Sequence, residues 1–182
     1  FIYFELRKMM GDFDRELRTQ IWGGIDLAVN SLALVTALFA TGRLATRAGM
    51  PFTLALIPAL MVGGWVVVAL SPVLAVLIGL QVTRRAGNYA ITRPGREMLF
   101  TAVDADTRFK AKPVIDIVVY RGGDVLTAWA YTALTATLGL GLTGIAAIAA
   151  AIAVIWAGAG VFLGRAYDRG GNAATSEQKA GD

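Results

Sequence analysis

Long apolar blocks follow one another along this chain, and each is about as long as a membrane-crossing helix. The hydrocarbon core of a bilayer, about 30 Å thick, takes about 20 apolar residues in a helix. Hydrophobic residues make up 56% of the 182 residues and charged residues 16%. A soluble domain has about 45–50% and about 25%, respectively. The pattern predicts an all-α, polytopic membrane protein.

We predict five complete spans and a short tail. The blocks that define the spans are residues 21–40, 51–70, 73–92, 113–138 and 140–163. Phe1–Phe4 is typical of the last turn of an earlier span, and no Met stands at position 1, so we expect a fragment of a longer protein. Residues 1–168 then form one helical half-domain. Residues 169–182 have the polar, Gly-containing composition of a disordered tail.

The connections between the blocks carry uneven charge, which predicts the orientation. Those on one side, including the C-terminal tail, hold ten Lys and Arg residues, and those on the other side hold four. Because cytoplasmic loops carry the excess of Lys and Arg, we expect the C-terminus in the cytoplasm. The net charge of +4 then follows from membrane topology, and we expect no nucleic-acid partner.

Several kinds of chemistry lack their usual residues in this sequence. The chain has no Cys and no His. Thiolate and imidazole metal ligands are therefore absent, as is the commonest general base. No Walker-type phosphate loop and no catalytic constellation is present. We expect no enzyme activity, no metal and no cofactor.

Charged side chains lie inside the predicted spans, where a lone charge costs about 2.5–3.5 kcal/mol. These residues are Asp26, Arg84, Arg85, Asp116, Arg121 and Asp124. Arg84 and Arg85 of span 73–92 should reach a depth similar to that of Arg121 and Asp124 of span 113–138, because the two helices run in opposite directions. We predict Arg–Asp pairing between these spans. The three aspartates then hold the arginines or carry a coupled proton, although such pairs can also serve packing alone.

Polar side chains recur on single helical faces in three spans. The fourth span carries Asp116, Tyr120, Asp124, Thr127 and Tyr131. The third carries Arg85, Tyr89, Thr92 and Arg96, with Arg84 and Asn88 beside them, and the first carries Trp22, Asp26 and Asn30. Lipid cannot solvate such stripes, so we expect these spans to line a water-filled cavity and the second and fifth spans to act as scaffold. The candidate substrate-binding residues are Arg84, Arg85, Asn88, Tyr89 and Arg121.

Glycines lie beside several of these charges. Gly87, Gly122 and Gly123 either loosen their helices at a binding site or allow close helix packing, and the sequence favours neither. Gly160 and Gly164 have the small-xxx-small spacing, which predicts helix packing.

Two local patterns resemble known transporters. Gly42, Arg47 and Gly49 resemble the cytoplasmic loop motif of the major facilitator superfamily, with Thr46 where Asp is usual. The stretch that contains Arg96-Glu97-Met98, the run from Asp104 to Lys112, and Ile115-Asp116 is similar to a segment of the ATP/ADP antiporters of plastids and obligate intracellular bacteria. One departure is Asp124, which stands where that family has a Lys important for transport.

The resemblance implies the C-terminal six-helix half of a divergent major-facilitator-type carrier in a bacterial inner membrane. Its cargo would be a nucleotide such as ATP or ADP, or a related phosphorylated anion, exchanged by alternating access. The missing N-terminal half would supply the other wall of the site. A proton-coupled carrier of another organic solute, and a non-transporting scaffold or partner subunit, are the alternatives.

Overall fold

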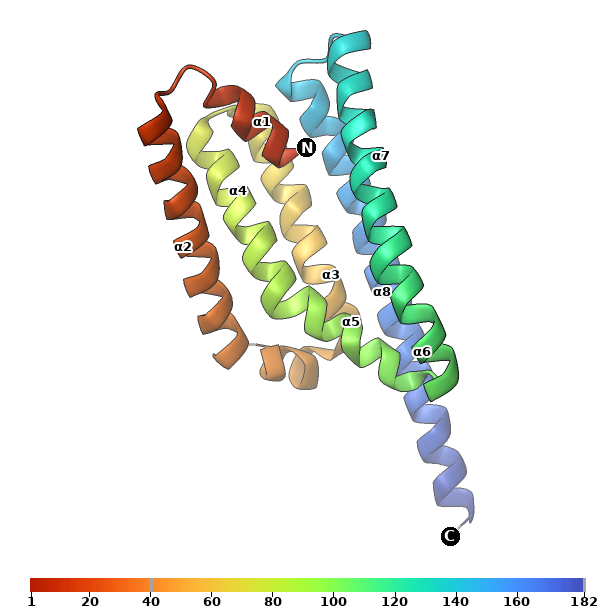
Figure 1. Cartoon of the computed structure of the whole chain (residues 1–182). Helices are drawn as coiled ribbons and strands as arrows, with labels where there is room; N and C mark the ends of the chain where they lie inside the picture. Colours follow the sequence, from red (N-terminus) through yellow and green to blue (C-terminus); the bar gives the residue numbers. More distant parts are fainter. Residues whose placement is uncertain (40, 182) are drawn as a thin grey trace.

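The computed structural model describes residues 1–39 and 41–181, with the side chains of residues 41, 45, 116 and 171–181 outside the description. Within these residues the regular structure is all helical, which confirms the all-α part of the predicted fold class, whereas the six-helix half of a major-facilitator-type carrier stays a prediction (Figure 1). The elements are α1 (Ile2–Met9), α2 (Arg15–Phe39), α3 (Thr41–Leu70), α4 (Leu74–Gly87), the π-helical η1 (Asn88–Thr92), α5 (Arg93–Leu99), the 3₁₀ turn η2 (Phe100–Ala102), α6 (Ala105–Val114), the π-helical η3 (Ile115–Val119), α7 (Tyr120–Thr132), the π-helical η4 (Ala133–Thr137) and α8 (Leu142–Gly181).

Three helices of the described chain are long and apolar enough to cross a membrane. They are Arg15–Phe39, Thr46–Leu70 and Leu142–Gly170. They overlap almost completely with three of the five predicted spans, 21–40, 51–70 and 140–163, and their length and composition indicate that the protein associates with a membrane. The other two predicted spans, 73–92 and 113–138, lie within the consecutive helical elements α4–η1–α5 and α6–η3–α7–η4. Both of these stretches carry charged residues. The count of five spans therefore remains a prediction.

The helices α3 and α8 form the most closely packed pair of the structure. A Cβ atom at Gly160 would lie 2.9 Å from the carbonyl oxygen of Leu54, and one at Gly164 would lie 2.4 Å from the Cα atom of Pro51. Both glycines are buried. The absence of side chains thus lets the two backbones touch, as the small-xxx-small spacing predicted.

A kink at Gly49 separates the first turns of α3 from its apolar part. The φ angle of Gly49 is +81°, a left-handed conformation that side chains with a Cβ rarely adopt. Gly42 and Arg47, the other residues of the loop motif, lie exposed on the short helical segment before the kink. In Figure 1 this orange segment runs across the lower end of α2 and α3.

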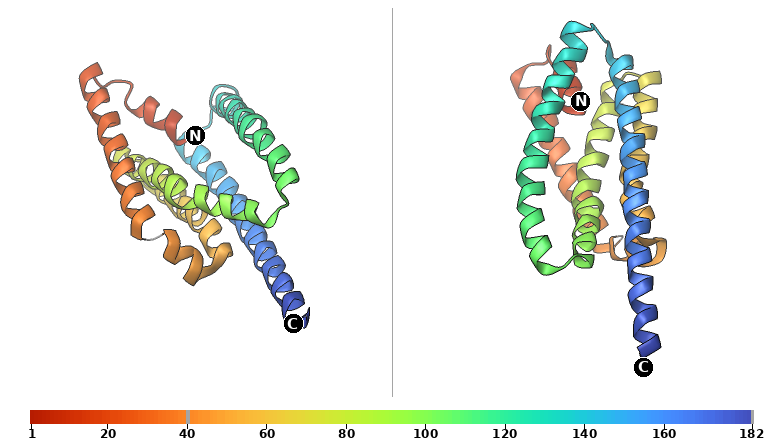
Figure 2. Two further views of the ribbon diagram at one scale, coloured as in Figure 1. Left: turned by 60° about the horizontal axis from the view of Figure 1, so that its bottom comes forward. Right: turned by 90° about the vertical axis from the view of Figure 1, so that its right-hand side faces the viewer.

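The rod that contains α7 stands apart from the other helices (Figure 2, left). At one of its ends Tyr131 packs against α1, and at the other Tyr120 contacts Arg96 of α5. Between these two contacts α7 borders a cavity that α3, α4 and α8 also line.

The last helix continues beyond the bundle, and the C-terminus lies at its far end (Figure 1). The sequence predicted a disordered tail from Arg169, whereas the backbone of α8 stays helical to Gly181. The fold does not distinguish the two sides of a membrane, so the cytoplasmic location of this tail stays a prediction.

Candidate functional site

A cavity of about 600 Å³ lies between α7 and the rest of the bundle, and we call it the central cavity. Its charged lining residues are Arg84 of α4 and Asp124 of α7. Thr127 of α7 adds a hydroxyl, while α3 and α8 contribute the apolar Trp65 and Trp156. The arrangement therefore offers one cation, one anion and aromatic surface to a solute.

Arg84 is oriented by its own helix. Its Nη2 atom donates a hydrogen bond of 3.2 Å to the Oε1 atom of Gln81, one turn earlier. Gln81 is only 3% exposed, so its amide has a fixed place in the core. Arg84 and Asp124 line the same cavity, but no direct ion pair between them is among the described contacts, so their pairing stays a prediction.

Arg85 points away from this cavity. Its Nη1 atom lies 2.5 Å from the Oδ1 atom of Asp26 on α2. The side chains are 30% and 54% exposed. The predicted pairing of Arg85 with the charges of α7 is therefore corrected, because Arg85 and Arg84 are neighbours on a helix and face different partners. Asp26 serves as the partner of Arg85.

A buried carboxylate that the sequence reading missed lies at the α1 end of the central cavity. Glu5 is 2% exposed and accepts a 3.0 Å hydrogen bond from the hydroxyl of Tyr131 on α7. The Tyr131 ring also stacks on Phe4, with centroids 4.6 Å apart. Glu5 was not among the candidate residues. The signal that could have found it is its place between Ile2 and Leu6, both buried on the same helix.

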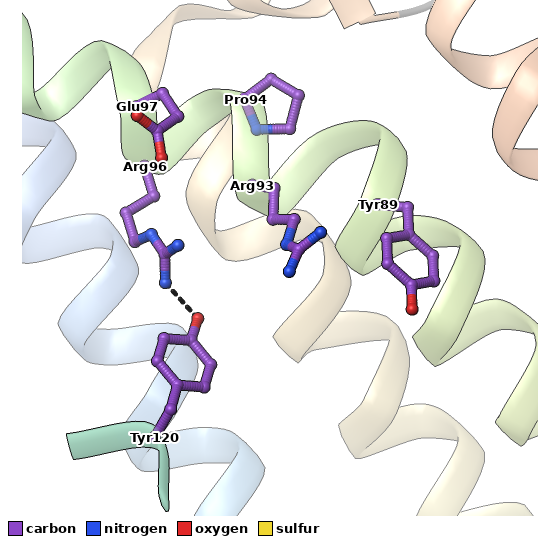
Figure 3. A pocket seen from close by; sticks show the side chains of 6 residues that line it. All are labelled: Tyr89, Arg93, Pro94, Arg96, Glu97 and Tyr120. Atoms are coloured by element: carbon purple, nitrogen blue, oxygen red, sulfur yellow. Dashed lines mark hydrogen bonds between the residues drawn. The ribbon is translucent and has the colours of Figure 1, made fainter. Parts of the chain in front are cut away.

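A second cavity, of about 630 Å³, lies where α5 meets the start of α7, and we call it the α5 pocket (Figure 3). The Arg93 guanidinium lies 5.3 Å from the centre of the Tyr89 ring, and that of Arg96 lies 5.0 Å from the centre of the Tyr120 ring. Arg96 also donates a hydrogen bond to the Tyr120 hydroxyl. Arg93 was not among the candidate residues, although it lies one turn after Tyr89.

The two parts of the segment that resembles the ATP/ADP antiporters contact each other beside this pocket. Lys112 donates a 2.6 Å hydrogen bond to Glu97, which joins the two halves of the motif. This bond lowers the pKa of Glu97 below its ordinary value. At the start of α6, the carboxylate of Asp104 accepts a 2.9 Å bond from the backbone N–H of Thr107. That N-cap lowers the pKa of Asp104 and explains why α6 begins there.

The remaining candidate residues either line neither cavity or have side chains outside the part of the chain that the structure describes. Arg121 is exposed on α7 and lines neither cavity. Asn88 is half-buried at the start of η1 and also lines neither. The side chain of Asp116 is not among those described. Gly122 and Gly123 face open space, so close packing does not explain them, whereas Gly87 packs against Ile57 of α3.

No described group of three or more His, Cys, Asp or Glu residues is arranged to hold a metal ion. No family model, curated protein or solved structure matches this chain. The resemblance to major-facilitator-type carriers and ATP/ADP antiporters therefore rests on the motif residues, and the two cavities carry the functional argument.

Proposed function

We propose that the chain is part of a secondary transporter that moves a phosphorylated organic anion, of the nucleotide class, through the space between α4–α5 and α7. The observation that carries this proposal is that Arg84 and Asp124 line one cavity between α4 and α7, two helices that the sequence predicts to lie in the membrane. An ionisable pair at such a depth is expensive unless it faces water, a ligand or a partner group.

The chemistry of the lining supports an anionic cargo. Guanidinium groups bind phosphate in a planar, two-pronged geometry that a lysine cannot offer. Arg84 supplies one such group in the central cavity, and Arg93 and Arg96 supply two in the α5 pocket. Tyrosine and tryptophan rings in both cavities can stack on a flat heterocycle. The nucleotide itself comes from the motif resemblance alone.

The way α7 is held supports alternating access. Its contacts with α1 and α5 are near its two ends, and the cavity lies between them. Loosening one end while the other stays closed would open the cavity to one side of the membrane. In the carrier that we propose, a second helical half covers the exposed face of α7 and completes the site.

Exchange of labelled ATP for ADP in proteoliposomes that contain the protein tests this function. We expect Arg84→Gln to abolish exchange, because it removes the only cation that lines the central cavity among the described residues. Arg108→Gln is the matched control, since it removes the same charge from an exposed position on α6. Exchange by Arg84→Gln at the rate of the unmodified protein would contradict the site, and no exchange of any nucleotide would contradict the cargo.

A proton-coupled carrier of another organic solute is the second candidate. Two carboxylates lie next to or on α7. Asp124 of α7 lines the central cavity, and Glu5 of α1 accepts the hydrogen bond from the Tyr131 hydroxyl. Uptake that depends on a pH gradient, is lost in Asp124→Asn and ignores nucleotides would favour this candidate.

A non-transporting scaffold predicts that no water reaches the polar face of α7. Because the chain has no Cys, Thr127→Cys and Leu126→Cys can be labelled one at a time. Thr127 lines the central cavity, and the adjacent Leu126 is 72% exposed on another face of α7. Transport predicts that a membrane-impermeant thiol reagent modifies Thr127→Cys faster than Leu126→Cys, and a scaffold predicts that it modifies neither.

A further inference from the structure

A third cavity lies at the turn between α1 and α2, and we call it the corner pocket. Figure 1 shows this turn at the upper end of α2. The volume of the pocket is about 240 Å³, and three of its lining residues are arginines, namely Arg7 of α1 and Arg15 and Arg18 of α2. Cavities that hold drug-sized ligands have volumes of about 300–1,000 Å³, so the corner pocket suits a smaller group.

The three guanidinium groups have no ion pair and no hydrogen bond among the contacts of the described residues. The acidic residues beside them in the sequence have other partners. The carboxylate of Asp14 accepts a 2.6 Å bond from the backbone N–H of Leu17, and that of Glu16 accepts a 3.4 Å bond from Gln20. Neither carboxylate lines the pocket. Like charges around one small space repel each other, and an anion in the pocket would relieve that repulsion.

Aromatic and apolar side chains form another part of the lining. The rings of Tyr3 on α1 and Trp22 on α2 lie with their centroids 5.5 Å apart. Met10, at the end of α1, is 1% exposed and belongs to the core. Tyrosine and tryptophan are enriched where a membrane meets water, because one part of each side chain is apolar and another is polar. The lining therefore suits a ligand with a charged group and an adjoining apolar part.

The corner pocket lies at the start of a helix that is long and apolar enough to cross a membrane. That helix is Arg15–Phe39. Arg15 and Arg18 are separated by about 4.5 Å along the helix axis. The headgroup layer on each side of a bilayer is about 5–7 Å thick. With α2 across the membrane, both arginines fit within one such layer, at the depth of the lipid phosphates.

The predicted topology does not account for this concentration of positive charge. All four Lys and Arg residues that we expect on the non-cytoplasmic side belong to the connection at residues 5–20. The other two connections on that side, residues 71–72 and residue 139, hold none. Because the positive-inside rule favours few basic residues there, a local ligand is a better reason for the cluster than the orientation of the chain.

We propose that the corner pocket binds a phosphate group between Arg7 of α1 and the pair Arg15 and Arg18 of α2, and that this group ties α1 to α2. A guanidinium group meets two phosphate oxygens at once, which makes arginine the side chain best suited to this task. The headgroup of an anionic lipid and a soluble phosphate compound both present such a group, and the position at the start of α2 favours the lipid. The site is separate from the central cavity and from the α5 pocket, so it does not depend on the proposed transport function.

Thermal unfolding of the protein in detergent micelles measures this binding, because a ligand of the folded state raises the unfolding temperature. One arm titrates phosphatidylglycerol, with phosphatidylcholine of the same acyl chains as the comparison lipid. A second arm titrates glycerol 3-phosphate. A larger rise with phosphatidylglycerol than with phosphatidylcholine identifies a lipid headgroup, and a rise with glycerol 3-phosphate alone identifies a soluble compound. A rise in both arms means that the site takes the phosphate group from either source.

We expect Arg7→Gln and Arg18→Gln each to raise the ligand concentration that gives half of this rise about tenfold or more. Both residues are exposed and lie on different helices, so each variant is a test even if the other does not fold. Lys8→Gln is the matched control, because it removes one positive charge from the exposed neighbour of Arg7 that does not line the pocket. It should leave the concentration dependence unchanged.

Three results would overturn the proposal. They are no rise in either arm, a rise that both arginine variants leave unchanged, and a loss in Lys8→Gln as large as that in Arg7→Gln. The outcome is separable from that of the transport test. Phosphate binding that depends on Arg7 and Arg18, in a protein that exchanges no nucleotide, would keep the corner site and remove the transported cargo. Exchange that depends on Arg84, without binding at the corner, would do the reverse.

Discussion

The contact between α3 and α8 allows a test in which a single methyl group decides the result. A Cβ atom at Gly164 would lie 2.4 Å from both the Cα and N atoms of Pro51. Ordinary van der Waals contact begins at 3.4 Å, so the shortfall is 3.4 − 2.4 = 1.0 Å. Both opposing atoms belong to the backbone of α3, so no side-chain rotation can relieve the clash. The two helices must separate along the whole contact.

The free energy cost of this clash can be compared with the effect of a control substitution, Gly158→Ala, on the same helix. Overpacking a close contact costs about 1–3 kcal/mol. At Gly158, where nothing lies within 4 Å, the same change to Ala should instead stabilise the helix, because Ala has the better helix propensity. That gain is about 0.5–1 kcal/mol. Gly164→Ala has the same propensity gain, because both residues lie in α8, so the two variants should differ in free energy of unfolding by the overpacking cost alone, roughly 1–3 kcal/mol.

Thermal unfolding of the purified protein in detergent micelles measures this difference. We expect Gly158→Ala to unfold at the highest temperature and Gly164→Ala at the lowest. Gly160→Ala should fall between them, because its Cβ atom would lie 2.9 Å from the Leu54 carbonyl oxygen. Equal unfolding temperatures for Gly164→Ala and Gly158→Ala would refute the claim that backbone contact holds α3 against α8.

Two further predictions concern the ends of α7 and α5. Tyr131→Phe keeps the ring that stacks on Phe4 but leaves the buried Glu5 without its described hydroxyl donor. The free energy of unfolding should therefore fall by about 1–3 kcal/mol. Thermal unfolding measures this loss, with Tyr3→Phe at an exposed position as the control. The bond from Lys112 lowers the pKa of Glu97, so ionised Glu97 adds a small stabilisation to the folded state. This stabilisation is complete above pH 4.5, the ordinary pKa of the group, and is lost as the pH falls through the lower pKa of the folded state. A scan of unfolding temperature downward from pH 4.5 should show a steeper fall in the unmodified protein than in Glu97→Gln, and identical slopes would contradict the assignment.

Features that depend on spacing within one helix were predictable from the sequence. The described members of the polar stripe in span 113–138 are Tyr120, Asp124, Thr127 and Tyr131, and all of them turn toward the other helices. The stripe lies mostly within the regular helix α7, so the period of 3.6 residues applies to it. The packing of Gly160 and Gly164 followed from spacing in the same way.

Features that depend on which helices become neighbours were not predictable in this way. A stripe tells which residues share a face, but it does not tell which helix that face meets. Asp26 was expected in a common cavity and instead pairs with Arg85 between α2 and α4. Glu5 was missed because its burial depends on α4 and α7, which lie far away in sequence.

The π-helical turn η1 explains why the predicted stripe on span 73–92 was only partly right. The period of 3.6 residues placed Arg85 on one face with Tyr89 and Arg96. A π turn has i→i+5 hydrogen bonds, so it adds one residue to the turn between Gly87 and Arg93. With that extra residue, Tyr89 and Arg96 continue the face of Arg84, not the face of Arg85. This shift leaves Arg84 in the central cavity, Tyr89 and Arg96 in the α5 pocket, and Arg85 turned toward α2. One inserted residue thus places the residues that line the two cavities along the same side of α4 and α5.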